Sequence, residues 1–111
     1  MTMKMTLSIY DDMHQQTARG LAYDLWRIHS STNRTQIKHD RISDHDQDLL
    51  IESDDESQMG SYELVLYTND YFEQFTDVDA LCTARFIVPF GFNQEQHLNI
   101  HIQPSSYTCT L

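Results

Sequence analysis

The chain has 111 residues, the length of one domain, and its 7 basic and 17 acidic residues give a net charge of −10 at neutral pH. This negative balance repels phosphate backbones and anionic lipid headgroups, so we expect neither a nucleic-acid nor a membrane partner. No apolar run reaches the roughly 18 residues of a membrane-spanning helix, and residues 1–6 lack the apolar core of a signal peptide.

The chain contains 2 cysteines, Cys82 and Cys109, which are far apart in the sequence and do not have the spacing of a metal site. We expect both to be free cysteines, which act as small, partly buried side chains in a reducing compartment. Together with the polar start of the chain, they lead us to expect a cytoplasmic protein.

The first 41 residues predict three strands. Residues 6–10 form a short strand candidate, which ends at two aspartates. Residues 20–28 are predicted as a strand, with Leu21, Tyr23, Leu25 and Arg27 on one face and Ala22, Asp24, Trp26 and Ile28 on the other. The polar run at residues 29–34 predicts a hairpin turn. Residues 35–41 contain a single apolar side chain, which favours a strand at the edge of a sheet.

Residues 42–59 are strongly acidic, and one apolar group at residues 49–51 interrupts them. We expect a solvated loop that is anchored by this apolar group. The acidic run resembles a calcium-binding loop only loosely, because it contains no central glycine. Gly60 then opens residues 61–67, a clear strand candidate.

The next segment predicts one short helix and one strand. Asn69 and Asp70 are suited to capping a helix that begins at Tyr71 and extends to residue 75 or slightly beyond. Residues 84–88 form the strand, which leads into a turn with exposed aromatic side chains at Phe90 and Phe92. The remaining large aromatic side chains are expected to build core and interface; they are Trp26, Tyr62, Tyr67, Tyr71 and Phe72.

Residues 97–103 give the clearest strand pattern in the chain, and Pro104 ends it. One face is apolar and is expected to pack into a core; it consists of Leu98, Ile100 and Ile102. The other face consists of His97, Asn99, His101 and Gln103. Two imidazoles and two amides are unusual for a plain solvated face, so we predict that this face lines a cavity or groove. Strands every 10 to 20 residues with one short helix predict a two-sheet β-sandwich.

The order of these segments resembles the transthyretin family, which includes the 5-hydroxyisourate hydrolases of urate breakdown. The similarity is strongest in the sequence Gly-Ser-Tyr-Glu-Leu-Val-Leu at residues 60–66, followed by Asp-Tyr-Phe at residues 70–72. Residues 20–28, residues 85–86, and residues 97–104 with Tyr107 are similar to further family strands. The resemblance implies an all-β, transthyretin-like (prealbumin-like) sandwich with one short helix over residues 1–111. It also implies a homotetramer, built as a dimer of dimers around a central channel.

The resemblance assigns the catalytic positions of the hydrolases to residues that have largely changed. Ser8 stands at the position of the first catalytic histidine, and Asp46 or Gln47 stands at that of the catalytic arginine. Residues 107–111 lack the Tyr-Arg-Gly-Ser ending of the hydrolases. Only His97 occupies a position where the resemblance implies a catalytic group.

These replacements predict weak hydrolysis. Ring opening by water needs a base and a donor for the developing oxyanion, and each contributes roughly 10²- to 10⁴-fold in rate. His97 remains suited to act as the base, but Ser8 does not shuttle protons at neutral pH and Gln47 carries no positive charge. Only a shifted alignment would let Arg34 or Arg41 supply the missing guanidinium.

We therefore predict a protein that holds a small planar cyclic molecule, similar to an oxidised purine, in a channel between subunits. His97 is the predicted catalytic residue, and the predicted ligand contacts are Ser8, Gln47, Asn99, His101 and Gln103. Two alternatives stay open: an active 5-hydroxyisourate hydrolase that uses His97, and a non-catalytic structural or protein-binding subunit. We expect no cofactor and no metal, because His97 and His101 lie roughly 13 Å apart along an ideal strand.

Overall fold

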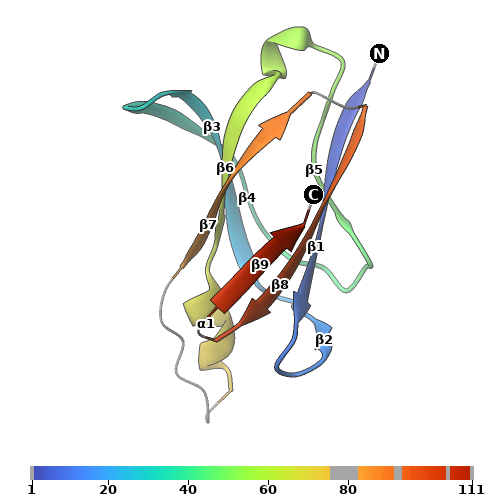
Figure 1. Cartoon of the computed structure of the whole chain (residues 1–111), viewed down its shortest axis with the longest axis vertical. Helices are drawn as coiled ribbons and strands as arrows, with labels where there is room; N and C mark the ends of the chain where they lie inside the picture. The colour runs from blue at the N-terminus through green and yellow to red at the C-terminus, as the bar shows by residue number, and fades with distance from the viewer. Residues whose placement is uncertain (1, 76–82, 92–93, 105, 111) are drawn as a thin grey trace.

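The structure is a computed structural model, which describes residues 2–75, 83–91, 94–104 and 106–110. Its strands form two sheets that pack face to face, as Figure 1 shows. This arrangement confirms the predicted two-sheet β-sandwich with a short helix.

The first sheet is built around β1 (Met3–Asp11) and β8 (Glu95–Gln103). These two strands pair in parallel, although they come from opposite ends of the chain. β9 (Ser106–Thr110) pairs antiparallel with β8. On the other side of β1, β2 (Gln16–Thr17) and β5 (Asp48–Ser53) pair antiparallel with different parts of the strand.

The second sheet has the order β4 (Asn33–Arg41), β3 (Ala22–Ser30), β6 (Gly60–Leu66) and β7 (Ala84–Phe90), and all its pairs are antiparallel. The predicted edge strand at residues 35–41 is confirmed, because β4 lies at the edge of this sheet. A 3₁₀ turn (Glu56–Gln58) precedes β6, and helix α1 (Thr68–Glu73) follows it.

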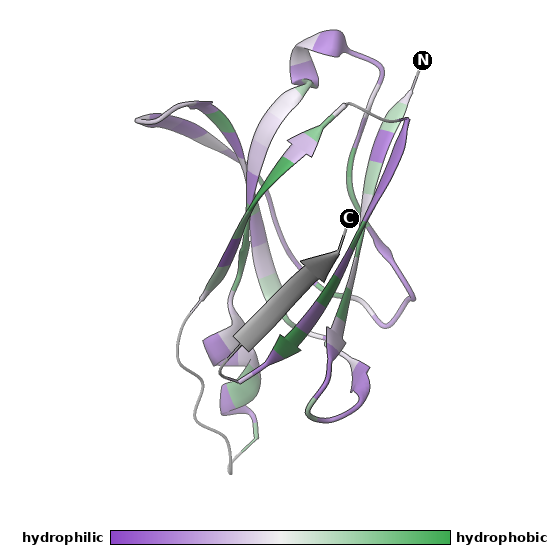
Figure 2. Ribbon diagram, in the orientation of Figure 1, coloured by the Kyte–Doolittle hydropathy of each residue, from purple (hydrophilic) through white to green (hydrophobic). Residues whose placement is uncertain are grey.

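The core lies between the sheets and consists of the side chains that point inward from alternate positions of the strands. Leu98, Ile100 and Ile102 of β8 are fully buried, as predicted, and they meet the buried side chains of β1. Figure 2 shows hydrophobic and hydrophilic residues alternating along the strands. Each inward side chain therefore leaves its neighbours on the outer face, where the polar residues gather.

The prediction of a loop over residues 42–59 is wrong, because this segment contains β5. The apolar group at residues 49–51 pairs with β1, and Leu50 is buried in the core. The acidic residues that surround it remain at the surface. Because β5 has only six residues, their composition dominates this segment, and the strand was not predicted.

Two local predictions near the second sheet are also wrong. Helix α1 begins at Thr68 rather than Tyr71, and no side chain caps its start, so Asn69 and Asp70 lie inside the helix. Phe90 is fully buried and meets the Tyr62 ring edge to face at 5.8 Å. β7 accommodates Pro89 because it is an edge strand, where a missing N–H group is tolerated. Phe92 lies outside the described residues.

A buried carboxylate joins the end of β1 to the helix. Asp11 is fully buried and accepts hydrogen bonds from the backbone N–H of His14, from His14 Nδ1 at 2.7 Å and from the Tyr71 hydroxyl at 2.8 Å. Burial, and then the hydrogen bond to Asp11, raise the pKa of Tyr71 above its usual value. The Tyr71 phenol therefore stays neutral and remains a donor. The hydrogen bonds to Asp11 thus connect β1 to the helix at this end of the sandwich.

The burial of β8 predicts a large loss of stability in Ile100→Ala. Removing this fully buried side chain should lower the free energy of unfolding by about 2–5 kcal/mol, because it leaves a cavity between the sheets. Urea unfolding followed by circular dichroism measures the change. The matched control is Ile87→Ala on β7, where the side chain is 62% exposed and the expected change is below about 0.5 kcal/mol. Equal effects of the two substitutions would contradict the assigned core.

Candidate functional site

The polar face of β8 lies on the outer side of the first sheet. His97, Asn99 and Gln103 are exposed, and His101 is partly buried. The polar face of the neighbouring strand β1 lies beside it, because the burial pattern of β1 alternates in the same way. Among the described residues, one end of this combined surface is hollowed into a pocket, and His97 lines it.

The pocket has a volume of about 370 Å³ and is formed where β1, β8 and the segment before β5 meet. Its lining side chains are all polar or charged; they are Lys4, Thr6, Gln47, Glu95, Gln96 and His97. The structure thus brings together His97 and Gln47, which were predicted as site residues from opposite halves of the chain. One ammonium and one carboxylate border the pocket, so its formal charge is close to balanced.

His97 is held by Thr6, its register partner on the parallel strand β1. The Nδ1 atom of His97 lies 2.8 Å from the Thr6 hydroxyl oxygen, and the same oxygen lies 3.5 Å from the backbone carbonyl of Gln96. When the hydroxyl donates to that carbonyl, it accepts the N–H of Nδ1, which leaves the lone pair on Nε2. This tautomer gives an exposed imidazole that accepts a proton or a hydrogen bond from a ligand.

Ser8 acts on the site through the backbone. Its hydroxyl donates to the carbonyl of Asp46 at 2.6 Å, and this bond fixes the segment that carries Gln47. The same segment is held from its other side, where Asp48 accepts the backbone N–H of Ser43 at 3.0 Å. Ser8 was predicted as a ligand contact; it is not among the lining residues of the pocket, and its hydroxyl holds the segment that carries Gln47.

The remaining predicted contacts lie away from the pocket. Asn99 is next to Ser8 in the parallel register, and Gln103 is at the far end of β8. The Nδ1 atom of His101 lies 2.7 Å from a carboxylate oxygen of Asp12, and its ring lies 5.6 Å from that of Tyr10. The structure does not gather these three side chains around His97.

Neither candidate arginine lines the pocket. Arg41 donates to the backbone carbonyl of Gly20, and Arg34 pairs with Glu63 on the second sheet. No guanidinium is among the pocket's lining residues, and the positive charge there comes from Lys4.

Comparison with solved structures finds the same arrangement of strands in proteins of low sequence identity. (S)-allantoin synthase has a TM-score of 0.85 at 14% identity, over 98% of this chain and 43% of that chain. Klebsiella pneumoniae 5-hydroxyisourate hydrolase has a TM-score of 0.77 at 16% identity, over 97% of this chain and 96% of that chain. Sea bream transthyretin in complex with thyroxine has a TM-score of 0.76 at 18% identity, over 96% of this chain and 92% of that chain.

The chain has the transthyretin-like fold. It spans 43% of the length of the allantoin synthase and nearly the whole of the hydrolase and of the transthyretin. No family model matches the sequence, and no curated protein matches it. The expected fold resemblance is therefore confirmed at the level of structure, despite the low identity.

The transthyretin-like chain offers no multidentate metal site within its described ranges, since no three His, Cys, Asp or Glu side chains gather there. Among those same residues, no helix has the length and apolar content needed to cross a membrane. Cys82 lies outside the described residues, and Cys109 is part of β9.

Four pocket residues were missed by the sequence analysis: Lys4, Thr6, Glu95 and Gln96. The alternation of residues 3–11 was the available signal for the first two, because it places Lys4 and Thr6 on the outer face with Ser8. Their proximity to His97 depends on the parallel pairing of β1 with β8, which no local pattern indicates.

The role given to Ser8 predicts that Ser8→Ala loosens the segment that holds Gln47. Loss of one hydrogen bond of about 0.5–1.5 kcal/mol should speed amide hydrogen exchange at residues 44–47 by about 2- to 10-fold. Exchange followed by mass spectrometry measures the effect. Asn99→Ala, next to Ser8 in the sheet, is the control and should leave the exchange of these residues unchanged. Unchanged exchange in Ser8→Ala would contradict the positioning role.

Proposed function

We propose that this transthyretin-like protein binds a small planar cyclic molecule, of the oxidised-purine type, in the pocket beside His97. The observation that carries the proposal is the polar pocket in which the Thr6–His97 pair, Gln47 and Lys4 converge. A purine ring edge alternates N–H donors with carbonyl acceptors, and the amide of Gln47 offers one of each. The ammonium of Lys4 complements the negative charge that oxidised purines carry at neutral pH.

The structural neighbours support a cyclic small molecule as the ligand. One of them is a 5-hydroxyisourate hydrolase, and another holds thyroxine. The absence of a guanidinium from the pocket lining supports binding rather than efficient turnover, because an ammonium lacks the planar, bidentate donor geometry of arginine. A cytoplasmic location, as expected from the sequence, agrees with a soluble metabolite as the ligand.

The proposal includes a homotetramer in which copies of the chain meet across the outer face of the first sheet. A pocket that is open to solvent on one side gains closure when a second copy covers it, and closure strengthens polar contacts by excluding water. His97 and Asn99 are exposed in the single chain, so they are available to face such a channel.

Titration with urate tests the binding proposal. Isothermal calorimetry should detect saturable binding, and His97→Ala should weaken it by about 2- to 10-fold, the effect of one lost hydrogen bond. His101→Ala is the matched control, because this histidine lies on the same strand but outside the pocket. The affinity of this variant for urate should equal that of the unchanged protein. Sedimentation equilibrium of the loaded sample should give about four times the chain mass of 13.1 kDa. Absence of binding, or equal losses in the two variants, would contradict the proposed site.

Hydrolysis of 5-hydroxyisourate is the second candidate, and the Thr6–His97 hydrogen bond favours it. The bond orients the imidazole and leaves Nε2 able to accept a proton from water, which is the task of a general base. In this reading the ring of the substrate lies in the same pocket, with Gln47 as a hydrogen-bond partner.

The decay of freshly generated 5-hydroxyisourate, followed by ultraviolet absorbance, separates the two candidates. We expect the protein to accelerate the decay by less than about 10-fold, because the arginine and the first catalytic histidine of the hydrolases are replaced. Acceleration of about 10²-fold or more that disappears in both His97→Ala and Thr6→Val would establish the hydrolase and reject a purely binding role.

A further inference from the structure

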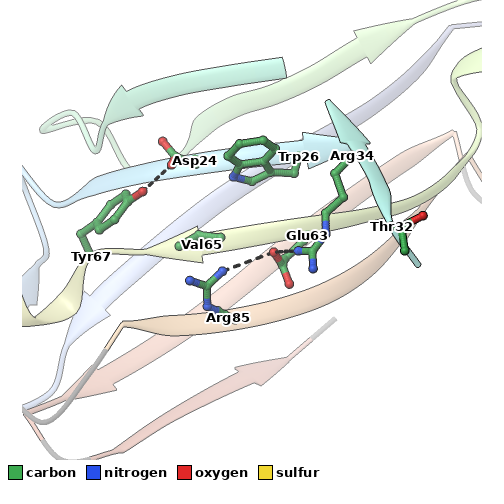
Figure 3. Close-up of a pocket in the computed structure, with 8 residues that line it drawn as sticks. All are labelled: Asp24, Trp26, Thr32, Arg34, Glu63, Val65, Tyr67 and Arg85. Carbon is green, nitrogen blue, oxygen red and sulfur yellow. Dashed lines mark hydrogen bonds and ion pairs between the residues drawn. The ribbon is translucent and has the colours of Figure 1, made fainter. Parts of the chain in front are cut away.

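The outer face of the second sheet carries a pocket of about 380 Å³ that the proposed function does not use. Figure 3 shows the residues that surround it, which come from β3, β4, β6 and β7 and from the turns that follow β3 and β6; they are Asp24, Trp26, Thr32, Arg34, Glu63, Val65, Tyr67 and Arg85. Pockets of roughly 300–1,000 Å³ accommodate small ligands, so the volume suits a compact molecule of one ring.

One end of the pocket is fixed by the carboxylate of Asp24, whose side chain is only 7% exposed. It accepts hydrogen bonds from the hydroxyl of Tyr67, from Nδ1 of His39 and, at 3.3 Å, from the amide of Gln36. His39 lies on β4, directly opposite Asp24 in the sheet. These donors satisfy the carboxylate and hold the Tyr67 ring in place, so this end is rigid and its charge is already compensated.

The other end contains a second buried carboxylate with two guanidinium groups above it. Arg34 and Arg85 each direct one nitrogen to the same oxygen of Glu63, at 2.5 Å and 3.4 Å. The Glu63 side chain is 10% exposed, whereas those of Arg34 and Arg85 are 43% and 60% exposed. The negative charge therefore lies in the floor and the positive charges lie at the rim, where an incoming ligand meets them first.

Between these two ends the pocket is apolar. Val65 is almost fully buried, and the half-buried indole of Trp26 lies between Asp24 and Arg34 in Figure 3. The outer face of an antiparallel sheet normally carries polar side chains that water solvates. The half-buried indole between two ordered ion clusters offers a surface for a flat ring instead.

The charge of the rim selects the sign of the ligand. Of the 7 basic residues in a chain of net charge −10, Arg34 and Arg85 both border this pocket. Each guanidinium has five N–H donors arranged for planar acceptors, and one nitrogen of each contacts Glu63. A ligand carboxylate that approaches from solvent can therefore bind the outer edges of the two guanidinium groups without displacing Glu63.

We propose that this pocket is a second ligand site, which binds a small aromatic carboxylate with its ring on Trp26 and its carboxylate on Arg34 and Arg85. The site is independent of the proposed function, because His97 lies on the outer face of the other sheet. Tyr67 borders the pocket at the end where Asp24 lies, and Arg85 lies between Tyr67 and Arg34 in Figure 3.

The single tryptophan of the chain reports directly on this site. Titration with 4-fluorobenzoate should change the fluorescence of Trp26 saturably, with a Kd of about 1 mM, a value consistent with a ligand of this size. The ¹⁹F signal of the ligand should broaden in parallel. The neutral isostere 4-fluorobenzyl alcohol should bind at least about 10-fold more weakly, because it lacks the charge that the guanidinium groups recognise.

Arg85→Gln should weaken 4-fluorobenzoate binding by about 10-fold, while Arg34 keeps Glu63 paired and the sheet folded. Arg41→Gln is the matched control, since this arginine is on the same sheet and outside the pocket, and it should bind like the unchanged protein. His97→Ala should also leave the tryptophan response unchanged, which separates this result from the fate of the urate site. No saturable response, equal binding of acid and alcohol, or equal binding by Arg85→Gln and Arg41→Gln would overturn the proposal.

Discussion

The parallel pairing of β1 with β8 is the constraint on which the candidate site depends. It joins residues that are 91 positions apart, such as Thr6 and His97, and it puts the start of the chain in the middle of the first sheet. A shift of this register by one residue would exchange the buried and exposed faces of a strand, so the core and the polar site would be lost together. The buried apolar residues of β8 therefore help to hold His97 in position on the outer face.

The two sheets use their outer faces differently. On the first sheet, polar side chains line an open hollow in which few groups are committed to one another, so a ligand finds donors and acceptors at its edge. On the second sheet, the carboxylates of Asp24 and Glu63 are already paired with donors, and the apolar surface between them remains. One sandwich core thus supports two surfaces of distinct chemistry, because side chains that point outward are free of the packing constraints of the interior.

The sequence predicted those parts of the fold that depend on local periodicity. Residues 97–103 alternate strictly, residues 61–67 are rich in apolar and aromatic side chains, and the two strands were identified with nearly correct limits. β5 was missed because its acidic neighbours dominate the composition, although Leu50 packs in the core. The start of α1 was misplaced because Asn69 and Asp70 suit a cap in isolation, while the end of β6 determines where the helix begins.

The candidate site was predictable only in part, for the same reason. His97 was identified from its strand and from the family resemblance, and Gln47 from an alignment position. Thr6 and Lys4 enter the site through a pairing between distant segments, which sequence periodicity does not encode. The cluster around Trp26 was hidden further, because four strands contribute to it and each contribution looks like ordinary strand alternation.

The carboxylate of Asp11 has a consequence for how the molecule opens. Asp11 ends β1 of the first sheet, while its donor Tyr71 belongs to the helix that follows β6 of the second sheet. Fraying of the helix would remove the Tyr71 donor from the buried carboxylate of Asp11. Fraying of β1 would leave the Tyr71 hydroxyl without its acceptor. We therefore expect β1 and α1 to unfold together at this end of the sandwich. Solvent should reach the interior there through this joint opening and not through the separate loss of either element.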